Sequence, residues 1–141
     1  MSEARRFFDT NILVYAFLPG DPLKMEQAQT LMGETVESTT GVISYQVWQE
    51  FASVAIRKFK VKASALEVME VFNALSQTMQ TVQSSERLFA AAVRLWSTYS
   101  LAWYDALIVA AALEGRCDVL YSEDLQDGLE IDGLRIVNPF R

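Results

Sequence analysis

Short runs of apolar residues alternate along the chain with longer segments in which apolar residues recur every three or four positions. The short runs are typical of buried strands, and the longer spacing is typical of helices that bury one face. The pattern predicts strands at 5–9, 81–82, 117–122 and, after a turn, within 131–140, with helices over 11–17, 21–33, 45–59, 64–75, 85–98 and 104–113. Strands that alternate with helices favour an α/β fold whose mainly parallel sheet is covered on both faces.

Residues with capping preferences mark several helix ends. Asp21, directly before a proline, predicts the start of a helix that ends near Gly33. Ser44 is expected to cap the next helix, and Ser84 and Ser85 can cap the helix that reaches Thr98. Gly115 stands where a left-handed C-cap belongs. The segment 36–44 is expected to be strand or loop.

Length and composition fit one domain, residues 1–141. Hydrophobic residues make up 51% of the chain and charged residues 21%, values typical of a globular protein. No internal repeat or linker divides it. The amino terminus lacks the apolar run of a signal peptide, and charges break the other apolar runs well short of the roughly 20 residues that span a bilayer. We therefore expect a cytoplasmic protein.

The absence of histidine limits the available chemistry. It removes the usual general base and the commonest transition-metal ligand, so catalysis must rely on carboxylates, hydroxyls or hard metal ions. The single cysteine, Cys117, has no partner for an internal disulfide and is expected to be a small buried residue.

The formal net charge of −6 argues against strong nonspecific binding to nucleic acid, because such binding needs cations. Several basic residues nevertheless cluster at one helix end: Arg57, Lys58, Lys60 and Lys62. This cluster is interpreted either as a solvated helix end or as a set of phosphate contacts.

Four acidic residues have surroundings that need an explanation. Asp9 lies in "RRFFDTNILVYAF", where a carboxylate is costly unless it is hydrogen-bonded, paired with a charge or bound to a metal. Asp105 is the only charge in "WYDALIVAAAL", although the helix dipole also favours an aspartate in a first turn. Glu50 lies at the edge of an apolar helix face, where glutamates are common, and Asp124 follows a strand, where turn aspartates are common.

The positions of these four residues predict that they converge. Asp9 and Asp124 each follow a strand, so they emerge at the same edge of a parallel sheet, which the two helical carboxylates can reach from its flank. Several carboxylates without a basic partner repel one another, and a divalent cation removes that repulsion. Oxygen ligands without histidine or an available thiolate suit Mg²⁺ or Mn²⁺, and such a centre supports phosphodiester hydrolysis.

The order of these motifs resembles the PIN-domain ribonucleases, particularly the VapC-type toxins of prokaryotic toxin–antitoxin systems. The resemblance covers essentially the whole chain and rests on "DTN" after the first strand, a helical glutamate, "YDALIVAAA" and a late "YSEDL". It implies a three-layer α/β/α sandwich, frequent homodimers, cleavage of single-stranded or looped RNA, and a cognate antitoxin that blocks the site.

The same resemblance implies roles for individual residues. Four acidic residues would hold Mg²⁺ or Mn²⁺ and carry catalysis: Asp9, Glu50, Asp105 and Asp124. Three polar residues match positions beside the metal that orient a carboxylate, the loop or a water: Thr10, Asn11 and Ser122. Two neighbouring acidic residues are further candidates for the site: Glu123 and Asp127.

Other functions remain open at this point. A catalytically silent PIN-like module would use the carboxylates for a structural cation, and a housekeeping RNA-processing nuclease would have the same site without an antitoxin. A phosphatase of the haloacid-dehalogenase type would use Asp9 as nucleophile, although such enzymes usually have a second aspartate where this chain has Asn11. The helix from Leu66 to Met79 is expected either to pack into the core or to supply an apolar dimer face.

Overall fold

The computed structural model describes residues 3–59 and 63–141, which form a six-stranded sheet and six helices. The strands are β1 (Arg6–Phe8), β2 (Gly41–Ser44), β3 (Gln80–Val82), β4 (Val119–Tyr121), β5 (Glu130–Ile131) and β6 (Leu134–Val137). The helices are α1 (Thr10–Phe17), α2 (Pro22–Ser38), α3 (Tyr45–Phe59), α4 (Ala63–Ser76), α5 (Glu86–Tyr99) and α6 (Trp103–Glu114). None of the helices in these ranges combines the length and hydropathy that crossing a membrane requires.

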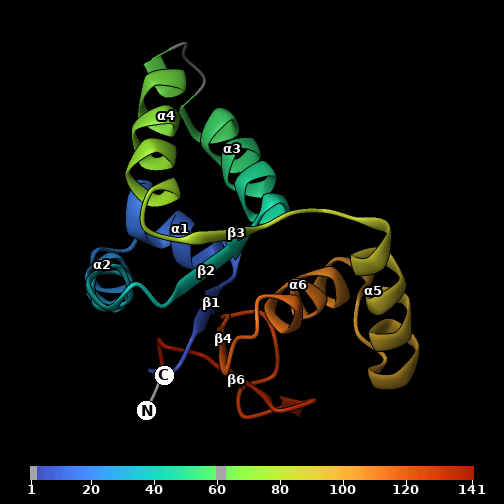
Figure 1. The fold of residues 1–141 in the computed structure, drawn as a ribbon. Coiled ribbons are helices and arrows are strands. Elements are labelled where there is room, and N and C mark those ends of the chain that lie inside the picture. The colour runs from blue at the N-terminus through green and yellow to red at the C-terminus, as the bar shows by residue number, and fades with distance from the viewer. Residues whose placement is uncertain (1–2, 60–62) are drawn as a thin grey trace.

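The sheet has the strand order β3-β2-β1-β4-β6-β5, and β5 is the one antiparallel strand among those described. Figure 1 shows α1 and α2 on one side of this sheet and α6 on the other side, and α5 packs against α6. The predicted α/β sandwich with a mainly parallel sheet is therefore confirmed. The chain adds strands outward from β1 in one direction and then returns to β4 on its other side, so strand order reverses between β1 and β4. Such a reversal opens a crevice at the carboxyl ends of the two strands.

The core explains why the apolar runs take these positions. β1 lies between two other strands, and both Phe7 and Phe8 are fully buried on its opposite faces. α6 packs against the sheet and α5, with Ala106 and the run from Ile108 to Ala112 buried. Cys117 is buried as expected, and burial raises the pKa of its thiol to about 12. These elements bring the end of β1 and the first turn of α6 to one edge of the sheet.

Several helix boundaries follow the predicted caps. The Ser44 hydroxyl accepts a hydrogen bond from the Val47 amide at 3.4 Å, and the Ser85 hydroxyl accepts one from the Leu88 amide at 3.0 Å. Asp21 caps α2 through the amides of the first turn. These local interactions need no tertiary contact, which is why the sequence predicts them.

The predicted end of one helix is wrong, and at another helix the C-cap position is right but its conformation is not. α2 continues five residues beyond Gly33 to Ser38, because Thr35 in its last turns is fully buried against the core and packing outweighs the weak helix preference of glycine. Gly115 has φ −74°, so it is not the left-handed cap; Arg116, with φ 56°, takes that conformation. Residues 36–38, expected to be strand or loop, are the end of α2.

Gly115 is required for a different reason, which is close packing between α6 and the sheet. A Cβ atom at Gly115 would lie 2.9 Å from Cγ1 of Val42 and 3.2 Å from Cγ2 of Val82. Both valines are buried and β-branched, so neither side chain can turn away. At Gly33, by contrast, no atom lies within 4 Å of an added Cβ.

These two glycines provide a matched test of the packing. We expect Gly115→Ala to lower the free energy of unfolding by about 1–3 kcal/mol through overpacking, and Gly33→Ala to raise it by about 0.5–1 kcal/mol through helix propensity. Urea unfolding followed by circular dichroism measures both changes. Equal effects of the two substitutions would show that α6 does not pack this closely on β2 and β3.

Candidate active site

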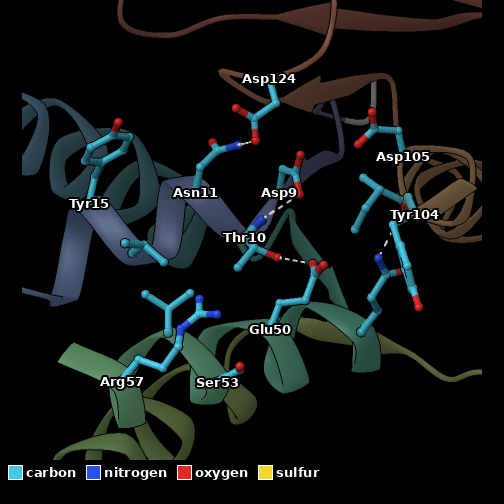
Figure 2. Close-up of a pocket in the computed structure, with 14 residues that line it drawn as sticks. Asp9, Thr10, Asn11, Tyr15, Glu50, Ser53, Arg57, Tyr104, Asp105 and Asp124 are labelled. Carbon is cyan, nitrogen blue, oxygen red and sulfur yellow. Dashed lines mark hydrogen bonds between the residues drawn. The ribbon is translucent and has the colours of Figure 1, made fainter. Parts of the chain in front are cut away.

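A cavity of about 590 Å³ opens at the carboxyl edge of the sheet, beside the ends of β1 and β4. We call it the acidic cleft. Figure 2 shows its side chains converging from α1, α3, α6 and the segment after β4. The lining comprises Asp9, Thr10, Asn11, Val14, Tyr15, Gln46, Glu50, Ser53, Val54, Arg57, Tyr104, Asp105, Ile108 and Asp124. All four predicted carboxylates therefore line one cavity.

Asp9 is the most buried of the four carboxylates, with 6% of its surface exposed. It follows β1 directly, caps α1, and accepts a hydrogen bond from the Thr10 amide at 2.7 Å. Its other carboxylate oxygen accepts the hydroxyl hydrogen of Ser122, at 2.8 Å. Ser122 is fully buried at the end of β4 and also accepts hydrogen bonds from the amides of Asp124 and Leu125. One serine therefore joins Asp9 to the turn that carries Asp124.

The two residues after Asp9 hold the carboxylates of two other segments. The Thr10 hydroxyl donates to Glu50 on α3 at 2.7 Å. The Asn11 side-chain amide donates to Asp124 at 3.1 Å, and its carbonyl oxygen accepts from the Glu123 amide at 3.2 Å. The three consecutive side chains of the "DTN" sequence thus contact two segments of the site, α3 and the turn after β4 (Figure 2).

Asp105 reaches the acidic cleft from the opposite side, in the first turn of α6. Its pKa is raised, mainly by burial and also by the negative charges of Asp124 and Glu50. The pKa of Asp9 is raised to about 6, mainly by burial, against the lowering effect of its hydrogen bonds to Ser122 and Thr10. The charges of Glu50 and Asp124 raise it further. The four carboxylates therefore repel one another across the acidic cleft.

This donor set suits a hard divalent cation in its chemistry and charge. The acidic cleft offers carboxylate oxygens from four segments, and Arg57 is the one cationic side chain among the described residues of its lining. As the side chains are oriented here, however, no three Asp, Glu or Cys residues within the described ranges form an arrangement that could hold a metal ion. Asp9, Glu50 and Asp124 instead accept hydrogen bonds from Ser122, Thr10 and Asn11.

Neither further acidic candidate lines the acidic cleft. Glu123 accepts a hydrogen bond from Lys24 on α2 at 2.8 Å; burial alone would raise the pKa of Glu123, but this contact and others lower it. Asp127 accepts a hydrogen bond from the Asn138 amide at 2.8 Å in an exposed turn. Asp124 is thus the acidic residue that this segment contributes to the cavity.

The structure also adds residues that the sequence pattern did not single out. Tyr15 and Tyr104 stand at opposite ends of the acidic cleft in Figure 2, and Gln46 lies beside Tyr104. In the sequence Tyr104 begins the apolar helix predicted over 104–113, and the one signal of a functional role is its position next to Asp105. Of the basic cluster, Arg57 lines the acidic cleft, whereas Lys60 and Lys62 lie outside the described residues.

Comparison with known families identifies the family of the chain. Residues 6–126 match the model of the PIN domain, so the chain belongs to the PIN domain family. The matched range contains the "DTN" sequence and all four carboxylates. No curated protein matches the chain at a significant level.

Several solved structures have the same fold. A toxin–antitoxin complex from Klebsiella pneumoniae contains a chain that is 26% identical, with a TM-score of 0.69 and coverage of 95% of this chain and 97% of that one. VapC20 from Mycobacterium tuberculosis, described as a toxin that cleaves the sarcin-ricin loop, is 16% identical with a TM-score of 0.67, over 84% of this chain and 91% of that one. A chain of DNA-bound VapBC from Salmonella typhimurium is 17% identical with a TM-score of 0.64, over 95% and 97% of the two chains.

The raised pKa of Asp9 predicts a specific pH dependence of stability in EDTA. The unfolded protein ionises Asp9 near pH 3.8 and the folded protein near pH 6, so the unfolded state binds fewer protons between these values. The free energy of unfolding therefore falls through this interval as pH rises, by an amount on the order of 3 kcal/mol. Urea unfolding between pH 4 and 7.5 measures this fall. In Asp9→Asn the fall should be smaller by about this amount, and parallel profiles for the two proteins would contradict the assignment.

Proposed function

We propose that the chain is a metal-dependent endoribonuclease that hydrolyses phosphodiester bonds in RNA, and that it is the toxin of a toxin–antitoxin pair. The observation that carries this proposal is the convergence of four carboxylates, from four segments of a PIN domain, on one open cavity. The solved relatives support it, because their descriptions include toxin–antitoxin complexes and an RNA-cleaving toxin. The family match also favours this function over a phosphatase of the haloacid-dehalogenase type.

In the proposed mechanism, Asp9, Asp105 and Glu50 hold Mg²⁺ or Mn²⁺, and Asp124 completes the site through water or with a second ion. When bound, the cation supplies the Lewis acidity that activates a water and offsets charge on the scissile phosphate. Thr10, Asn11 and Ser122 position the carboxylates through the hydrogen bonds described above.

Arg57 is proposed to bind an RNA phosphate. It lies on α3 two turns beyond Glu50 and lines the same cavity, where its guanidinium can approach a phosphate that the carboxylates alone would repel. Such a contact positions RNA without reading its sequence.

A protein antitoxin and a second copy of the chain are the proposed partners, and the cytoplasm is the proposed location. The domain is proposed to span residues 1–141. Apolar side chains exposed on two helices support protein partners: Leu66, Met69 and Phe72 on α4, and Phe89, Val93 and Trp96 on α5. Of the two alternatives for the segment from Leu66 to Met79, core packing holds for Leu75 and Met79, which are buried. A dimer face on the exposed part of α4 stays a proposal.

The first test is cleavage of a mixed cellular RNA pool by the purified protein with Mg²⁺, Mn²⁺ or EDTA. We expect discrete cuts with either metal and none in EDTA. Asp9→Asn and Asp105→Asn should each lower the cleavage rate about 100-fold or more, since each removes a metal ligand worth several kcal/mol. Sequencing of the new RNA ends measures both the rate and the cut positions.

Asp127→Asn is the matched control, because it makes the same charge change in a turn outside the acidic cleft. It should cut at the rate of the unchanged protein. Cutting in EDTA, or cutting that survives both Asp9→Asn and Asp105→Asn, would contradict the proposal. Metal binding without cutting would favour the silent binding module, and absence of a neighbouring antitoxin gene would favour a housekeeping nuclease.

Removal of Arg57 tests the phosphate contact. Arg57→Ala should raise KM for RNA several-fold, leave the cut positions unchanged, and reduce the slope of log affinity against log salt by about 0.7. Arg87→Ala is the control, because Arg87 lies on α5 and is largely exposed beside Glu114. Equal salt slopes for Arg57→Ala and Arg87→Ala would exclude a phosphate contact at Arg57.

A further inference from the structure

A second, smaller cavity of about 130 Å³ adjoins the acidic cleft, and we call it the side pocket. It is lined by Ser44, Gln46, Gln49, Val82, Ser84, Leu88, Tyr104, Leu107 and Ala111. Gln46 and Tyr104 line both cavities, so they form the boundary between them. The side-chain amide of Gln46 donates to the backbone carbonyl of Tyr104 at 3.3 Å, which ties α3 to α6 at this boundary.

The lining of the side pocket is apolar at its floor and polar at its rim. Val82, Leu88 and Ala111 are buried, whereas Gln49 and Ser84 are exposed. A nucleobase has the matching chemistry, because its faces are apolar and its edge carries hydrogen-bond donors and acceptors. The volume of the side pocket suits a single flat ring system and leaves no room for a folded peptide or a duplex.

The ring of Tyr104 supplies a stacking surface at the boundary between the side pocket and the acidic cleft. It is 66% exposed, although most residues of α6 are buried, and it immediately precedes Asp105. An aromatic ring this exposed has little role in the core, and its removal should leave the fold intact. Proteins that bind single-stranded RNA commonly stack unpaired bases on such rings.

We propose that the side pocket binds one unpaired nucleobase of the RNA substrate, in the nucleotide next to the scissile phosphate, with Tyr104 stacking on the base. Gln49, Ser84 and the free amide atoms of Gln46 face the base edge and select among bases. The inference rests on the proposed function, because it takes the acidic cleft to hold the phosphate. It assigns sequence preference to this pocket and leaves Arg57 as a contact that reads no sequence.

The first experiment measures base binding without cleavage. Hairpin RNAs with single-stranded loops of different sequence carry the fluorescent base 2-aminopurine at one loop position, and the full chain is titrated in EDTA. We expect binding to quench the fluorescence at one loop position. Tyr104→Phe should retain the quenching and Tyr104→Ala should abolish it. Trp96→Ala, which removes an exposed aromatic ring from α5 outside both cavities, should have no effect.

The second experiment removes the base from the substrate. An abasic nucleotide beside the cut site should lower kcat/KM of the unchanged protein with Mg²⁺ by about tenfold or more, the loss that one stacked base produces. Tyr104→Ala should lower kcat/KM on the intact RNA by a similar factor and cause no further loss on the abasic RNA. Ser84→Leu, which fills the side pocket without changing Tyr104, should reproduce the loss on intact RNA.

The two experiments separate this inference from the proposed function. Quenching that depends on Tyr104, without cleavage in Mg²⁺, would support the side pocket and overturn the nuclease. If the RNA is cleaved with equal kcat/KM by the unchanged protein and Tyr104→Ala, the side pocket does not bind a base, and the nuclease proposal is unaffected. The same conclusion follows if the losses from Tyr104→Ala and from the abasic RNA are additive. Absence of both quenching and cleavage would overturn both.

Discussion

The hydrogen bond between Ser122 and Asp9 is the interaction on which the site depends. Asp9 is nearly fully buried at the end of the central strand β1, where an unpaired carboxylate would be strongly destabilising. Ser122, at the end of the neighbouring strand β4, donates to that carboxylate and accepts two backbone amides of the following turn. The Asp9 carboxylate therefore finds its hydrogen-bond donor where strand order reverses. The turn that carries Asp124 is held by the same atom, Oγ of Ser122.

Around this contact, the fold holds four carboxylates close together although their negative charges repel one another. Burial and the neighbouring carboxylates raise the pKa values of Asp9 and Asp105, so ionising the site in the absence of a cation opposes folding. Hydroxyl and amide donors from "DTN" and Ser122 reduce this cost without adding positive charge. The net negative charge of the site is thereby kept, whereas an internal lysine or arginine beside Asp9 would neutralise it.

The two cavities divide the proposed task of RNA recognition between different physical interactions. The acidic cleft contains four carboxylates and Arg57, and these charged groups suit a cation and a phosphate. The side pocket has an apolar floor and a polar rim, and this lining suits a base. Gln46 and Tyr104 join the two regions because α3 and α6 both begin at the carboxyl edge of the sheet. Chemistry and base preference can thus be changed by different substitutions on the same two helices.

The sequence by itself determined the features that depend on local interactions. The apolar run of β1, the caps Asp21, Ser44 and Ser85, and the order of the four carboxylates all follow from short-range patterns. The tertiary structure decided the rest: α2 passes Gly33 because Thr35 is buried, Glu123 turns toward Lys24, and Tyr104 stands exposed between two cavities. These outcomes depend on contacts between residues far apart in the chain, which periodicity and capping preferences do not encode.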